Sequence, residues 1–301
     1  MNYYLLLPIA FVAIGATSSG ALRRRLPPRH ATRILAVTAV GTALAVIWAT
    51  LSLLVSSLGH PGWLADVAGW CHHLYRSEAT GQPMASALAA VALLAVSTGV
   101  VRASLRERRA FRAVPAGTGP ISLIDSAVPF AYAVPGRLGH AGRIIVSSFL
   151  FESLDVDERC ALLAHERAHL RHHHHRYRMA ADLAAAALPP LRPAARHVRF
   201  ASERWADEEA VEAVRDRRLV ARAIARAAVL GHQAGPSSRL ALAESGVVAR
   251  VEALLHPPRK RRTSDSIALL SGMAALTMTV LGSTVQLHHL LALALHACTL
   301  H

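Results

Sequence analysis

LLAHERAHL, residues 162–170, is the stretch around which the rest of the chain can be organised. It holds the pattern H-E-x-x-H inside an apolar run. His165 and His169 are four residues apart, so on a helix their imidazoles lie on one face, one turn apart. That spacing lets both rings bind one metal ion, with Glu166 beside the open coordination position. The alternative interpretation is a His-rich helix face that is simply solvated.

The residues around this pattern favour a packed helix. Asp155 with Glu158 three residues later is a capping-box arrangement that predicts where the helix begins. Small residues, Ala164 and Ala168, flank the motif and would let another segment approach closely. We therefore expect a helix from Asp155 to about Tyr177.

A third metal ligand is expected from a separate segment, because a catalytic zinc takes three protein ligands and keeps one position open. The best candidate is Glu203, which lies one helical turn before Asp207 in a helix predicted over residues 202–214. Glu203 can bind the metal while Asp207 accepts the free ring N–H of a metal-binding histidine. The alternative is a solvated acidic helix face.

The composition predicts membrane spans. Of the 301 residues 53% are hydrophobic and only 17% are charged, which is too apolar for an ordinary soluble protein. The predicted spans are residues 3–22, 34–58, 84–101 and 267–287. A signal peptide is the alternative for residues 3–22, but the basic residues follow that run instead of preceding it.

The basic residues set the predicted orientation. The net charge of +14 comes from clusters beside the apolar runs, at residues 23–33, 102–109 and 259–262. By the positive-inside rule these clusters face the cytoplasm, and both termini lie outside. Topology explains them better than nucleic-acid binding, because no basic patch with interleaved aromatic residues exists elsewhere. We expect three membrane helices in residues 1–103, a cytoplasmic domain in 104–263, and a fourth helix with a short outer tail in 264–301.

The expected fold is a mainly α membrane protein whose cytoplasmic domain is α+β with a small sheet. Alternation and Gly/Pro punctuation predict short strands, and apolar periodicity predicts the helices. The predicted strands are residues 120–125, 130–134 and 143–148, and the further helices are residues 179–188, 219–230 and 245–255. The helix over 179–188 is too short to cross a bilayer, so it is either buried or interfacial.

Five segments in this order resemble a known family. They are AYAVPG (131–136), RIIVSS (143–148), AHERAHL (164–170), ERWAD (203–207) and RVEALL (250–255). The series is similar to the membrane zinc metallopeptidases of the BlaR/MecR antirepressor class, which are related to the HtpX and CAAX-prenyl-protease class of gluzincins. The resemblance covers roughly residues 120–256.

The resemblance implies roles for the candidate residues. His165, His169 and Glu203 would bind one Zn²⁺, Glu166 would be the catalytic base, and Asp207 would hold a metal-binding histidine. The strand of Phe130, Ala131, Tyr132, Ala133 and Val134 is a weaker candidate for pairing with an extended substrate by strand addition.

The function expected from the sequence is a zinc endopeptidase at the cytoplasmic face of a bacterial plasma membrane. Its substrate would be a protein or peptide, such as a cytoplasmic transcriptional repressor or the protein itself, in regulated proteolysis. One alternative is HtpX-like quality control of membrane proteins. A non-catalytic membrane metal-binding or sensor protein is an alternative of another class. No penicillin-binding sensor domain follows the last predicted span, so we do not expect a β-lactam receptor.

The histidine run and the cysteines each allow more than one interpretation. The run His172–His175 is expected to be a solvated helix end, with packing near the metal site as the alternative. Three cysteines are too few for a disulfide framework, although Cys71 and Cys298 both fall on the predicted outer face.

Overall fold

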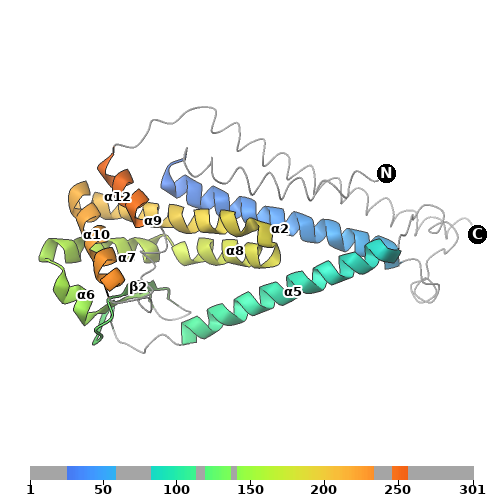
Figure 1. Cartoon of the computed structure of the whole chain (residues 1–301), viewed down its shortest axis with the longest axis horizontal. Helices are drawn as coiled ribbons and strands as arrows, with labels where there is room; N and C mark the ends of the chain where they lie inside the picture. The colour runs from blue at the N-terminus through green and yellow to red at the C-terminus, as the bar shows by residue number, and fades with distance from the viewer. Residues whose placement is uncertain (1–25, 59–82, 113–118, 137–140, 234–245, 257–301) are drawn as a thin grey trace, which may run out of the picture.

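Two long helices extend from a helical domain that carries a small sheet (Figure 1). This computed structural model describes residues 26–58, 83–112, 119–136, 141–233 and 246–256. The long helices are α2 (Pro28–Leu58) and α5 (Pro83–Arg112). The domain contains β1 (Ile121–Ile124), β2 (Ala131–Val134), β3 (Arg143–Ser147), α6 (Ser148–Ser153), α7 (Val156–Arg171), α8 (His174–Ala187), the 3-10 turn η2 (Pro189–Leu191), α9 (Arg192–Val214), α10 (Arg217–Gln233) and α12 (Val247–Leu255).

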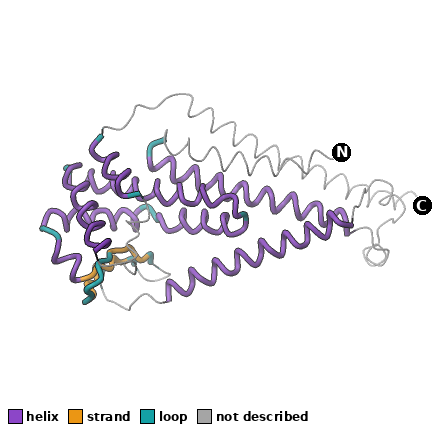
Figure 2. Tube along the Cα trace, viewed as in Figure 1, coloured by secondary structure: helices purple, strands orange, loops and turns teal. Residues whose placement is uncertain are grey.

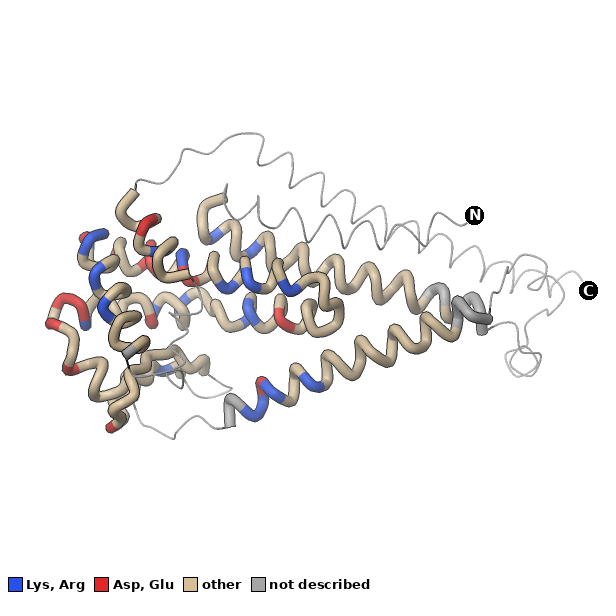
Figure 3. Tube along the Cα trace, viewed as in Figure 1, with Lys and Arg blue, Asp and Glu red and all other residues tan. Residues whose placement is uncertain are grey.

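The long helices α2 and α5 are the candidate membrane helices. They are long and apolar enough to cross a bilayer over Pro28–Leu51 and Ala87–Arg109. Figure 3 shows that charged residues gather on the helical domain and on the adjoining ends of α2 and α5, away from their far ends. The sequence predicted four spans, whereas the described residues contain two. The predicted spans over 3–22 and 267–287 lie outside the described residues, as do Cys71 and Cys298.

Helix α2 does not stand apart from the helical domain. Its residues Ala31, Leu35, Ala39 and Ala43, spaced four apart, form a buried stripe against α8 and α9. The facing helices present mainly alanine on this side, so the backbones can approach closely. This candidate membrane helix and the two helices that follow the H-E-x-x-H motif therefore share one core.

Helix α5 meets α8 at a glycine. A Cβ atom at Gly99 would lie 2.3 Å from the carbonyl oxygen of Ala186, which no real side chain tolerates. The φ angle of Gly99 is one that any residue can adopt, so its backbone conformation does not require glycine. The close approach of α5 to α8 requires it. This contact ties the second candidate membrane helix to the end of α8.

The strands, orange in Figure 2, form one small sheet. The sheet is mixed, with strand order β1-β3-β2. β1 runs parallel to β3, and β2 runs antiparallel to it, with Tyr132 opposite Ile145. All three predicted strands are present, each within its predicted range. Helix α6 was not predicted; it begins where the Ser147 side chain accepts a hydrogen bond from the Leu150 backbone N–H.

The capping box at the start of α7 is confirmed. The Asp155 side chain accepts from the Glu158 backbone N–H, and the Glu158 side chain accepts from the Asp155 backbone N–H. Glu158 is fully buried because Arg222 and Arg226 of α10 neutralise it, at 3.2 and 2.8 Å. The start of the motif helix is thereby fixed to α10.

The predicted end of the motif helix at Tyr177 is wrong. α7 ends at Arg171, and His173 takes a left-handed conformation with φ of +52°, after which α8 begins at His174. Helices α8, α9 and α10 are longer than predicted, whereas α12 begins two residues later than predicted and ends at the predicted residue. α9 starts ten residues before the predicted Ser202, where η2 leads directly into it with Pro193 in its first turn.

We predict that Gly99→Ala destabilises the protein by about 1–3 kcal/mol, because the added methyl group must push α5 away from the α8 backbone. Thermal unfolding of the detergent-purified protein measures the change. Ser97→Thr adds one methyl group at an exposed position of the same helix and should leave the unfolding temperature unchanged. An equally stable Gly99→Ala protein would contradict the close packing of α5 on α8.

Candidate metal centre

The two histidines of the motif face each other on α7. The Nε2 atoms of His165 and His169 are 3.1 Å apart, and the rings meet edge to face with centroids 4.8 Å apart. Both side chains are largely buried. The one-turn spacing thus directs both imidazoles to one point, as the sequence predicted.

Helix α9 brings a carboxylate to the same point. Glu203 Oε2 lies 3.4 Å from His165 Nε2, and Glu203 Oε1 lies 3.6 Å from His169 Nε2. One potential ligand atom from each of the three residues falls within 4.8 Å of the others. The structure therefore brings together all three predicted ligands, from helices 34 residues apart along the chain (169 to 203).

Asp207 lies behind His165. Its Oδ1 is 3.0 Å from His165 Nδ1, on the opposite side of the ring from the Nε2 that faces Glu203. Asp207 is fully buried, so it is held by charge pairing and not by water. The carboxylate occupies the place that the sequence predicted for a partner of a metal-binding histidine.

Arg250 of α12 neutralises the two acidic residues of α9. It donates to both oxygens of Asp207, at 2.8 and 2.6 Å, and its Nη1 lies 3.0 Å from Glu203 Oε2. The Arg250 side chain is fully buried, so it cannot contact a substrate. Its role is to hold the acidic face of α9 in place.

The electrostatics keep both acidic residues ionised. Burial alone would raise the pKa of Glu203, but Arg178 and Arg250 outweigh it and hold the pKa well below the usual range. Burial likewise opposes ionisation of Asp207, and Arg250 lowers its pKa. Burial would lower the pKa of His165, but its contacts with Asp207 and Glu203 raise that pKa to about 9. The two ionised carboxylates thus make this buried site favourable for a positive charge.

Glu166 follows His165 directly and is buried, with 5% of its surface exposed. Burial raises its pKa above the usual range of a glutamate. A carboxylate whose pKa is moved toward neutrality is suited to accept and return a proton. This position and environment fit the predicted catalytic base.

The donor set fits zinc. His165 and His169 both turn Nε2 inward, and both have their Nδ1 atoms engaged on the outer side, by Asp207 at 3.0 Å and by His174 at 2.8 Å. Two imidazole nitrogens and one carboxylate, with the outer nitrogens held, form the ligand pattern of a catalytic zinc. These residues could hold the ion without rearranging the helices.

The sequence did not single out Arg178 or identify the contact of His174. Arg178 donates to Ser202 Oγ at 2.8 Å and forms an ion pair with Glu203. His174 was expected to be solvated, but it is fully buried. Burial and the nearby Arg178 lower its pKa to about 3, so its ring is neutral. The run of four histidines was the only sign in the sequence that one of them could lie near the metal site, and the sequence does not indicate which one is buried.

The predicted substrate strand lies at the edge of the sheet. Phe130 exchanges hydrogen bonds with Ser147, its N–H donating to the hydroxyl at 3.1 Å and its carbonyl accepting from the backbone N–H at 2.9 Å. Within the described residues, no strand pairs with the other edge of β2, which packs beside α7. That edge can accept an extended chain by strand addition.

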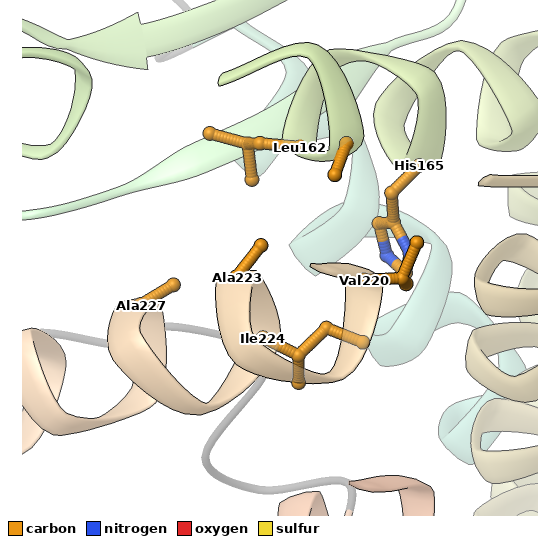
Figure 4. Close-up of a pocket in the computed structure, with 7 residues that line it drawn as sticks. Leu162, His165, Val220, Ala223, Ile224 and Ala227 are labelled. Atoms are coloured by element: carbon orange, nitrogen blue, oxygen red, sulfur yellow. The ribbon is translucent and has the colours of Figure 1, made fainter. Parts of the chain in front are cut away.

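A small cavity beside His165 is not a substrate site. The cavity lies between α7 and α10, and Leu162 and Ala223 are among the residues that line it. Figure 4 shows the His165 side chain directed from α7 toward Val220 of α10. Its volume is about 10 Å³, near the minimum for one water molecule. Its lining is almost entirely apolar, so it is a packing gap between the two helices.

Comparison with protein families matches residues 101–189 to peptidase family M48. The matched segment contains His165, Glu166 and His169 and ends before Glu203. No curated protein and no solved structure matches the chain. The family match indicates a metallopeptidase, and the structure adds the carboxylate from α9 that the matched segment lacks.

Arg250→Met should lower stability by about 3–5 kcal/mol, because it leaves two buried carboxylates without their counter-charge. The double variant Arg250→Met, Asp207→Asn should be more stable than Arg250→Met alone, since one uncompensated charge is gone. Denaturant unfolding of the metal-free protein checks both. A double variant less stable than the single one would contradict the ion pairing described above.

Proposed function

We propose that the chain is a membrane-anchored zinc endopeptidase that cleaves peptide bonds at the cytoplasmic face of a bacterial plasma membrane. The proposal rests on the convergence of His165, His169 and Glu203 within 4.8 Å and on the buried Glu166 that follows His165 in α7. The match of residues 101–189 to peptidase family M48 supports the same class of reaction.

Each residue of the site has a role in this proposal. His165, His169 and Glu203 would hold one Zn²⁺, which when bound acidifies water and polarises the scissile carbonyl. Glu166 accepts the proton from the attacking water and passes it to the leaving amine nitrogen. Asp207 keeps His165 in the orientation that points Nε2 inward. The free edge of β2 aligns the substrate in an extended form.

Regulated proteolysis is the role we favour over constitutive quality control. Helix α2 is packed on α8 and α9, the helix that carries Glu203. The guanidinium of Arg33 in α2 lies over the ring of Trp205, 5.0 Å from its centroid and two residues beyond Glu203 in the chain. A shift of α2 would therefore be passed to α9, the helix that carries Glu203. The substrate would be a cytoplasmic repressor or the protein itself.

We predict that Glu166→Gln lowers peptidase activity on fluorescently labelled casein by about 10²–10⁴-fold while zinc binding is kept, since only the proton acceptor is removed. Glu212→Gln, at an exposed position of α9, is the matched control and should retain activity. A Glu166→Gln enzyme with wild-type activity would show that this residue is not the base. Zinc bound to an inactive wild-type protein would favour the non-catalytic alternative.

Removal of the metal should abolish activity, and one equivalent of zinc per chain should restore it. Glu203→Gln should weaken zinc binding, because an amide oxygen replaces the anionic ligand, while Glu212→Gln should bind zinc as the wild type does. Chelator dialysis followed by metal analysis and the casein assay measures both effects. Full activity after complete removal of zinc would rule out the metallopeptidase.

A further inference from the structure

His174 differs from the rest of the histidine run. It is fully buried, whereas His173 is exposed and His172 and His175 are half-buried. The rings of His173 and His175 contact each other, with centroids 6.0 Å apart. Only His174 turns from this run toward the candidate ligands.

The His174 ring contacts a candidate metal ligand directly. Its Nδ1 lies 2.8 Å from the Nδ1 of His169, and the two rings meet edge to face with centroids 4.8 Å apart. A hydrogen bond between these two nitrogens needs one hydrogen and one lone pair. Arg178 Nη2, which can only donate, also lies near the Nδ1 of His169, at 3.4 Å. If His169 offers its Nε2 lone pair to a metal, its Nδ1 carries the hydrogen, and of these two neighbours only His174, at 2.8 Å, can accept it.

The fold holds His174 in this place. The left-handed conformation of His173 reverses the chain after α7, so a residue five positions after His169 returns to that ring. The ring of Trp205 of α9 also packs against the His174 ring, with their centroids 4.7 Å apart. The indole also stacks on His172, at 4.6 Å. The ring of His174 is thus fixed by two helices that carry metal ligands.

We propose that His174 is a positioning residue that accepts the Nδ1–H hydrogen bond of His169 and so holds His169 in the tautomer that presents Nε2 to the metal. It does for His169 what Asp207 does for His165. The difference is that a neutral imidazole replaces a carboxylate. The inference rests on the proposed zinc site and adds a residue to it.

The test is the zinc affinity of the full-length, detergent-purified protein, measured by competition with a chelator of known affinity. His174→Phe keeps a ring against Trp205 but removes the acceptor, so zinc affinity should fall by about 10–100-fold. His174→Asn places an amide oxygen near the position of Nδ1 and should restore most of the affinity. His175→Ala, in the same run, is the matched control and should bind zinc as the wild type does.

A second measurement separates positioning from folding. The visible absorption spectrum of the cobalt-substituted protein reports ligand geometry, and it should change in His174→Phe and return in His174→Asn. Wild-type zinc affinity in a folded His174→Phe protein would overturn the assignment, as would equal losses in His174→Asn and His174→Phe. A wild type that binds zinc but cleaves no casein overturns only the peptidase proposal, because the affinities still decide the role of His174. A wild type that binds no zinc overturns both.

Discussion

Burial of like charge is the constraint on which the site depends. Glu203 and Asp207 lie one turn apart in a part of α9 that is removed from water, and two buried carboxylates can stay ionised only against positive partners. Arg250 reaches both from α12, and Arg178 reaches Glu203 from α8. These pairs join α9 to α12 and α8, while the contacts of Glu203 and Asp207 with His165 join α9 to α7. Stability of the fold and geometry of the site therefore come from the same contacts.

The packing of α2 extends this arrangement to the candidate membrane helices. Alanine-rich surfaces let α2 lie closely against α8 and α9, and Gly99 does the same for α5 against α8. Helix α2 and α9, the helix that carries the third candidate ligand, share one core. Such an arrangement suits an enzyme whose activity follows the state of its membrane helices, which is the basis for favouring regulated proteolysis.

The sequence predicted the part of the site that depends on periodicity alone. The spacing of His165 and His169, and of Glu203 and Asp207, fixes which side chains share a helix face, and the structure brings these faces together. The capping box at Asp155 likewise follows from local chemistry. The break after Arg171 could not be predicted, because His173 is not a glycine and its left-handed backbone is imposed by tertiary packing. Because the position of that break could not be predicted, the contacts of His174 with His169 and of Arg178 with Glu203 could not be predicted either.

The proposed metal centre takes two imidazoles from α7 and one carboxylate from α9 as the ligands of one zinc ion. Zinc K-edge X-ray absorption of the full-length protein with one equivalent of zinc tests it most directly. If His165, His169 and Glu203 are the ligands, the spectrum should show four light ligand atoms at about 2.0–2.2 Å with the outer-shell scattering of two imidazoles. Outer-shell scattering from three or four imidazoles, which would place the ion in the run His172–His175, would contradict it.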